Sequence, residues 1–299
     1  MVALVVTTAS SRASWAQACC AGGTVVTPAR LALHEDWAAG VQLRMRSNPG
    51  SFDAEGQYHR STGEEQVVEQ DVAVSARLAE RLQTGILIPF FQTHRNATGI
   101  DDWGGGLGDL SLSARYDVLW AGQALYWPGV SVVAGATLPT GTPPDQATHR
   151  LAADATGEGS YDVTGGVALD QVSGHVYASF SGWATHRFAR TVTITGAPAI
   201  HESFALRWTL LGVAGYVFDN ECALGVQMSM MNEGLATVNG KEAPSTRLRL
   251  TTAGVSGVVP IHDRWRIQGS LFSDVTVSSF GRNQPAGYGL TLAVMRVGL

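Results

Sequence analysis

Residues 104–118 read Gly-Gly-Gly-Leu-Gly-Asp-Leu-Ser-Leu-Ser-Ala-Arg-Tyr-Asp-Val, and from Asp109 onward two kinds of side chain alternate without a slip. One face collects Leu110, Leu112, Ala114, Tyr116 and Val118, and the other collects Asp109, Ser111, Ser113, Arg115 and Asp117. Because successive side chains of a strand point to opposite faces, this stretch predicts a strand with one apolar and one charged face. The glycines before it predict a tight turn with unusual backbone angles.

The same alternation recurs along the whole chain. It marks twelve segments, at 31–46, 68–78, 82–90, 109–118, 130–138, 161–169, 176–180, 204–216, 222–230, 247–250, 265–277 and 288–294. Helical spacing is nowhere sustained, so the predicted class is all-β. The connections alternate between short ones, at 78–81, 120–123, 170–174, 218–221 and 260–263, and long ones, at 48–64, 92–103, 139–158, 189–200, 232–245 and 279–286. This alternation predicts an up-and-down antiparallel transmembrane β-barrel of about 12 strands.

Composition favours lipid over a protein core as the environment of the apolar face. Only 15% of the 299 residues are charged, against roughly 25% in soluble domains, and Lys241 is the single lysine. Aromatic residues gather near the predicted strand ends, as in interfacial girdles: Trp37, Phe90, Tyr116, Trp127, Tyr161, Trp183, Trp208, Tyr216, Trp265 and Tyr288. A soluble sandwich or a large lipocalin-like barrel is the alternative. The net charge of −5 argues against nucleic acid as a partner.

The polar face carries charges of both signs, and these are the candidate lumen residues: Arg44, Glu69, Asp71, Arg77, Asp109, Arg115, Asp117, Asp162, Arg207, Arg247, Arg249, Arg266 and Asp274. Two interpretations stand side by side. The charges line a pore and select solutes, or they pair with one another and plug the interior. The loop at 139–158 likewise either folds inward as a constriction or forms an exposed surface.

The N-terminus reads as an export signal. Residues 2–6 are apolar and Ala16-Gln-Ala18 has the form of a cleavage site, so we expect a signal peptide at 1–18, a segment at 19–28 and one barrel domain at 29–299. A disordered tail is the alternative, and Cys19 is a candidate for lipidation. The sequence shows no phosphate-binding loop and no metal-ligand spacing, so we expect no cofactor and no metal.

Three segments together resemble a known family. They are Gly106-Leu-Gly-Asp-Leu-Ser-Leu112 with Ala114-Arg-Tyr116, then Ala134-Gly-Ala-Thr-Leu-Pro-Thr-Gly141, then Gly157-Glu-Gly-Ser-Tyr-Asp-Val163. In this order they resemble transporter-like outer-membrane proteins grouped with the phenol meta-pathway degradation family. The resemblance implies an outer-membrane channel, linked in some members to uptake of hydrophobic or aromatic compounds.

Three functions follow from this reading. The first is an outer-membrane channel for small molecules, hydrophobic or aromatic ones among them, and not an enzyme. Its short turns would lie in the periplasm and its long loops outside, and its partners would be outer-membrane lipid, an unknown solute and the barrel-assembly machinery. The second is a lipid-modifying enzyme using His175, His186 or His201. The third is a structural barrel with a plugged lumen.

Overall fold

The computed structural model describes residues 30–298, except 33, 98, 124–126, 194–197, 245, 263 and 279. The expected signal peptide, the segment at 19–28 and Cys19 lie outside the described residues. The strands are β1 (Trp37–Phe52), β2 (Tyr58–Ala79), β3 (Leu82–Ala97), β4 (Ile100–Leu107), β5 (Leu110–Leu119), β6 (Gly129–Leu138), β7 (Asp162–Ser173), β8 (Val176–Arg187), β9 (Arg190–Val192), β10 (Ile200–Ser203), β11 (Arg207–Val217), β12 (Ala223–Glu233), β13 (Thr237–Val238), β14 (Lys241–Glu242), β15 (Leu248–His262), β16 (Trp265–Asp274) and β17 (Gln284–Gly298).

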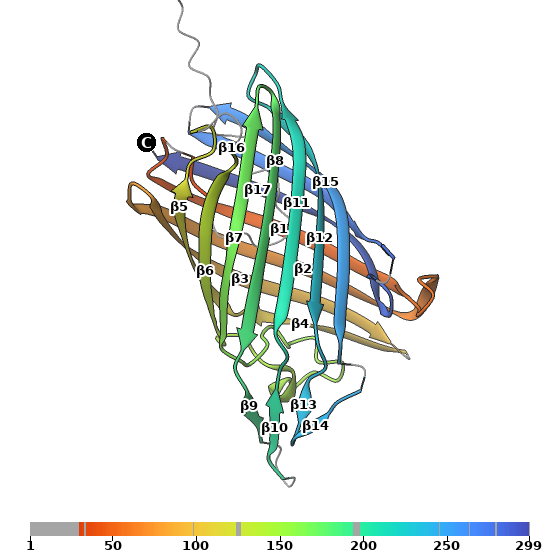
Figure 1. Cartoon of the computed structure of the whole chain (residues 1–299). Helices are drawn as coiled ribbons and strands as arrows, with labels where there is room; N and C mark the ends of the chain where they lie inside the picture. Colours follow the sequence, from red (N-terminus) through yellow and green to blue (C-terminus); the bar gives the residue numbers. More distant parts are fainter. Residues whose placement is uncertain are drawn as a thin grey trace, which may run out of the picture.

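The long strands form a closed antiparallel barrel (Figure 1). β1 pairs with β2 on one side and with β17 on the other, so that Val41 lies opposite both Val72 and Val294. In the part of the chain that the structure describes, twelve strands complete the circle, in the order β1-β2-β3-β5-β6-β7-β8-β11-β12-β15-β16-β17. The predicted fold class is therefore confirmed. Short strands β9, β10, β13 and β14 form a separate sheet at the end with the long loops.

β4 and β5 continue one another along the same neighbour. Leu107 of β4 lies opposite Phe90 of β3, and Ser111 of β5 lies opposite Leu87. The interruption between them falls at Gly108 and Asp109. The expected long loop at 92–103 is therefore mostly strand, because β3 runs to Ala97 and β4 begins at Ile100.

The alternation of the sequence separates an outer and an inner face. Val41, Leu224 and Leu271 point outward with 58–61% of their surface exposed, as expected of side chains that meet lipid. Gln83, Ser131 and Thr209 point inward and are among the most buried side chains. Among the described residues, no helix is both long and apolar enough to cross a membrane.

The predicted first strand begins too early. We expect it from residue 31, but β1 begins at Trp37. In the segment before it, 30–36, the residues Leu31, Ala32 and Glu35 are buried, whereas His34 and Asp36 are exposed. We call this segment the strap. Leu31 and Glu35 are both only 3% exposed, so a charged residue that the strand reading placed on the lipid face lies in the interior.

Candidate functional site in the barrel lumen

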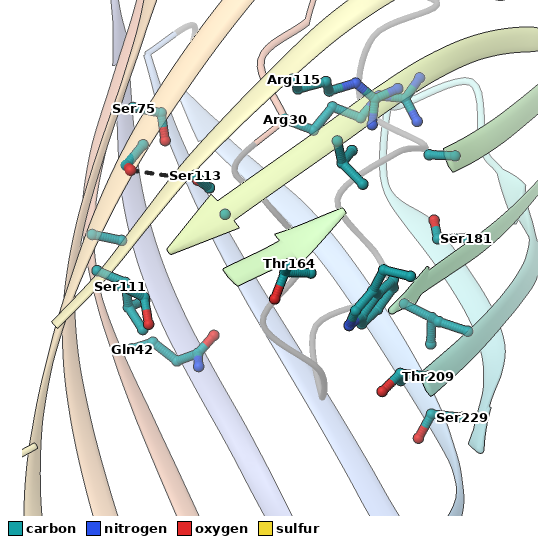
Figure 2. A pocket seen from close by; sticks show the side chains of 18 of the residues that line it. Arg30, Gln42, Ser75, Ser111, Ser113, Arg115, Thr164, Ser181, Thr209 and Ser229 are labelled. Carbon is teal, nitrogen blue, oxygen red and sulfur yellow. Dashed lines mark hydrogen bonds between the residues drawn. The ribbon is translucent and has the colours of Figure 1, made fainter. Parts of the chain in front are cut away.

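The lumen contains a cavity of about 670 Å³. Its lining comes from strands on all sides of the barrel and from Arg30 of the strap. Figure 2 shows side chains from several strands pointing into this space, with Arg30 and Arg115 side by side near one end. A cavity of this volume lies within the usual range for small-molecule sites.

The end of the cavity near the short turns holds a buried charge network. Arg115 Nε donates to Asp117 Oδ1 at 2.9 Å, and its Nη2 donates to Asp170 Oδ2 at 2.8 Å. Ser131 Oγ donates to Asp117 at 2.7 Å, and Gln83 Nε2 donates to the other oxygen of Asp117 at 2.9 Å. Each charge meets an opposite one, which is the arrangement that makes buried ions tolerable.

The strap crosses the lumen at this same end. Arg30 forms an ion pair with Asp170 of β7, and Glu35 receives a bidentate contact from Arg266 of β16, at 3.0 and 3.3 Å. β7 and β16 lie five strands apart in one direction around the barrel and seven in the other. The strap is therefore tied to nearly opposite walls.

Two further contacts hold the backbone of the strap. The amide of Leu31 donates to Gln83 Oε1 at 2.8 Å, and Arg77 donates through Nε to the carbonyl of Glu35 at 3.0 Å. Arg77 also donates to the carbonyl of Ala32. Two of the expected lumen residues, Arg77 and Arg266, thus serve to fasten the strap.

The end near the long loops holds a second charge network. Arg187 contacts Glu158 and Glu233, the latter at 3.0 Å, and Arg207 Nε donates to Glu233 at 2.7 Å. Asp162 lies 3.8 Å from Arg187 Nε. This network again combines both signs of charge.

A third set of charges lies on β1, β2 and β16. Arg44 donates to Glu69 at 2.8 Å, Gln42 donates to Asp71 at 2.9 Å, and Arg46 pairs with Asp274. Nε and Nη2 of Arg44 are buried without a described hydrogen-bond partner, so Arg44 keeps donors available inside the barrel.

The middle of the cavity is uncharged on the wall formed by β5 to β12. Along β7, Thr164 lies between Asp162 and Asp170. The polar lining here consists of hydroxyls, from Ser111, Thr164, Ser181, Thr209 and Ser229 (Figure 2). Apolar side chains join them, namely Trp183, Leu211, Met231 and Leu250. The prediction that Trp183 belongs to an outer girdle is therefore wrong, because its position on β8 has the parity of inward-facing Ser181.

Asp109 anchors a loop instead of standing free in the lumen. Its two carboxylate oxygens accept the amides of Gly141, at 2.9 Å, and Glu158, at 2.7 Å. Thr140 Oγ1 donates to the carbonyl of Gly108 at 2.7 Å. The three sequence segments behind the family resemblance thus meet at one point, the break between β4 and β5.

The loop at 139–161 packs against β4 along much of its length. Ala153 is fully buried, and a Cβ added to Gly104 would lie 2.4 Å from the amide nitrogen of Asp154. Asp102 accepts the amide of Leu151 at 2.8 Å and contacts Nδ1 of His149 at 2.9 Å. The amide of Leu151 and the imidazole of His149 lower the pKa of Asp102, and the bond to Asp102 raises the pKa of His149.

Asp154 fastens the same loop from within. Its carboxylate accepts the amide and the hydroxyl of Thr148, both at 2.8 Å, and these bonds, the amide first, lower the pKa of Asp154 to about 2. The loop is thus a folded unit on β4 and not an unattached surface segment.

The candidate lumen residues fall into four groups. Arg44, Glu69, Arg115, Asp162 and Arg207 line the cavity, while Asp71, Arg77, Asp117, Arg266 and Asp274 join the inward hydrogen-bond and ion-pair contacts described above. Asp109 anchors the loop. Whether the first two groups select a solute stays a prediction.

Arg249 and Arg247 form the fourth group. The predicted inward orientation of Arg249 is wrong, and Arg247 precedes β15 and is exposed. On β15, Leu250 and Thr252 line the cavity, whereas Val255 and Val259 are about half exposed on the outside. Arg249 shares the parity of Val255, so it points outward. The sequence pattern predicts the wrong orientation for this strand because the apolar Leu248 and Leu250 suggest that their side faces lipid.

The histidines of the enzyme hypothesis lie in three separate surroundings. His175 stacks on Tyr216 with ring centres 5.3 Å apart, His186 packs edge-on against Phe188, and His201 lies beside Thr191 in the β9–β10 sheet. Across the described ranges, no three His, Cys, Asp or Glu side chains gather into a group that could hold a metal ion.

Comparison with solved structures identifies the fold. An outer membrane channel from Pseudomonas putida F1 is similar with a TM-score of 0.72 over 89% of this chain and 97% of that chain, at 18% sequence identity. The translocator domain of the autotransporter NalP from Neisseria meningitidis is similar with a TM-score of 0.51 over 87% and 88%, at 11% identity. No family model and no curated protein matches the sequence. The chain therefore has the fold of outer-membrane β-barrels, and its family resemblance stays a prediction.

Proposed function

We propose that this protein is an outer-membrane channel for small uncharged molecules, hydrophobic and aromatic ones among them. The observation that carries the proposal is the cavity of about 670 Å³, whose β5–β12 wall combines hydroxyls with Trp183, Leu211 and Met231, while Leu250 of β15 adds a further apolar contact. Such a wall offers apolar contact and single hydrogen bonds, which suits an amphipathic solute. The proposal assigns no catalytic role to the chain, and the three histidines of the enzyme hypothesis lie in separate surroundings.

The arrangement of charge supports an uncharged solute. Both ends of the cavity carry networks in which arginines and carboxylates pair. A charged solute would have to replace these partners as it passed, at the full cost of separating buried ions. On the β5–β12 wall in the middle of the cavity, an uncharged solute meets hydroxyls and apolar groups.

The proposed location follows from the outer face. The apolar outer face and the similarity in fold to solved outer-membrane barrels support a place in the outer membrane. In this placement the short turns and the strap lie at the periplasmic end and the long loops lie outside. In this placement residues 1–18 are a signal peptide and the assembly machinery for barrels inserts the chain.

A plugged structural barrel is the second candidate, and the strap favours it. Its ties to β7 and β16 place a folded segment across one end of the lumen. The two candidates differ in whether a solute gains access to the cavity.

Planar-bilayer recordings of the refolded full chain separate them. We expect discrete current steps that benzyl alcohol blocks in a saturable manner, while benzoate, with the same ring and a charge, blocks far less. Trp183→Ala should weaken the block, and Trp127→Ala, at an exposed turn position, should not. An absence of current steps together with an absence of saturable benzyl alcohol binding would refute the channel.

A further inference from the structure

Two arginines stand on the outer face of the barrel at the end with the long loops. Arg249 lies opposite Asn232 of β12, and Asn232 lies opposite Trp208 of β11, so the three residues form one outward row across three strands. Arg247 directly precedes β15, two residues before Arg249, and is exposed. Both arginines therefore lie on the surface that the barrel presents to its surroundings.

This row marks the edge of the apolar band. From Trp208, the outward positions of β11 run to Tyr216, and the facing positions on β12 and β15 include the exposed Leu224, Val226 and Val255. The eight residue-to-residue steps from Trp208 to Tyr216 cover about 27 Å along the strand, or about 20 Å along the barrel axis at the usual tilt. That distance is close to the height of the apolar band of outer-membrane barrels. Arg249 and Arg247 are thus placed at the level of lipid head groups.

The surroundings of the pair are aromatic. Phe280, from the loop after β16, packs edge-on against Trp208 with ring centres 5.8 Å apart. Tryptophan at this level is typical of a membrane interface. The Trp208–Phe280 pair thus forms an aromatic surface beside the arginines.

Within the described part of the chain, both guanidinium groups lack a partner. No hydrogen bond, ion pair or ring contact involves either side chain among the residues that the structure describes. The outward Arg296 at the opposite rim differs, because it lies 5.9 Å from the ring centre of Trp37 and 5.8 Å from that of Trp265. Arg296 is satisfied by its own chain, whereas Arg247 and Arg249 keep ten N–H donors for an external acceptor.

We propose that Arg247 and Arg249 bind the phosphate groups of lipid A, the phosphorylated lipid of the outer leaflet. Guanidinium groups bind phosphate through paired hydrogen bonds, and two of them only two residues apart match a lipid with more than one phosphate. The choice of lipid A rests on the proposed location, in which the long loops face outward.

Native mass spectrometry of the purified full chain in detergent tests the proposal. The probes are bisphosphorylated lipid A, monophosphoryl lipid A, phosphatidylglycerol and inorganic phosphate. We expect the R247A/R249A variant to bind bisphosphorylated lipid A at least about tenfold more weakly than the wild type, as the loss of charge-assisted hydrogen bonds implies. Monophosphoryl lipid A should bind the wild type more weakly, and phosphatidylglycerol and inorganic phosphate more weakly still.

The matched control is R264A/R296A, which removes two exposed arginines at the opposite rim. It should retain lipid A as the wild type does, and the R247K/R249K variant should retain part of the affinity. Equal lipid A binding by wild type and R247A/R249A would overturn the proposal, as would phosphatidylglycerol binding as strong as that of lipid A. The channel proposal is tested separately by bilayer recordings of the wild type. If the protein shows no conductance but still binds lipid A through these arginines, the channel proposal is refuted and the lipid-site proposal stands.

Discussion

Removal of the Glu35 side chain should open the end of the lumen that the strap crosses. Glu35→Ala deletes the carboxylate that Arg266 contacts at 3.0 and 3.3 Å and that also accepts the amide of Ala32 at 2.9 Å. The strap would keep its ties to Gln83, Arg77 and Asp170 but lose its attachment to β16.

The size of the effect follows from burial. The side chains of Arg266 and Glu35 are 5% and 4% exposed, so solvent screens their interaction little. Removing one partner of a buried pair costs about 3–5 kcal/mol. Because about 1.4 kcal/mol corresponds to a factor of ten, even the lower figure shifts the docked and displaced populations of the strap by about a hundredfold. A strap displaced in about 1% of wild-type molecules would then be displaced in about half of the variant.

Single-channel recording measures this population directly. The open probability should rise with Glu35→Ala, while Glu80→Ala, which removes an exposed carboxylate at the same end, should leave it unchanged. If the open probability of the two variants is the same and their resistance to heat unfolding is equal, the strap does not close the lumen.

Three further predictions concern the loop at 139–161. Asp109→Asn should weaken its two bonds to backbone amides by about 1–2 kcal/mol in total and speed hydrogen exchange at Gly141 and Glu158, and unchanged exchange would contradict the anchoring role. Gly104→Ala should displace the loop and make it sensitive to protease, because the new Cβ would meet the backbone of Asp154 at 2.4 Å, whereas Gly165→Ala, with open space around it, should not. The pKa of His149 is raised, so the stability that its bond to Asp102 gives the docked loop should be complete below about pH 6.5 and be lost as the pH rises through the raised pKa. Protease sensitivity of the loop, measured from pH 5 to 9, should therefore increase with pH in the wild type, and His149→Ala should abolish this pH dependence.

The strands could be predicted because lipid and lumen impose opposite demands on alternate residues. That rule fails where an inward position is apolar. The apolar Leu248 and Leu250 predict a lipid-facing side, and Arg247 and Arg249, which alternate with them, are therefore predicted to face the lumen. Read as one strand from 248 to 262, the segment shows the correct parity, since Val255 and Val259 alternate with Ser256. The local run was too short to decide the face.

The strap could not be predicted from the sequence for a different reason. Its contacts join residues far apart in sequence, such as Glu35 and Arg266, and no local pattern encodes that pairing. One signal was present: Glu35 broke the parity of the expected first strand. A charged residue at a lipid-facing position indicates that the segment is not a lipid-facing strand. Trp183 was misplaced likewise, because aromatic residues suit both an interface and a solute-binding wall.

The position of Glu35 against Arg266 also sets an order of events during assembly. The two residues are 231 positions apart, and the seat of the strap is built from β2, β3, β7 and β16. The binding site for the strap is therefore incomplete until nearly the last strand has joined. We expect the strap to dock after the ring of strands has formed, so that a docked strap would indicate a complete barrel.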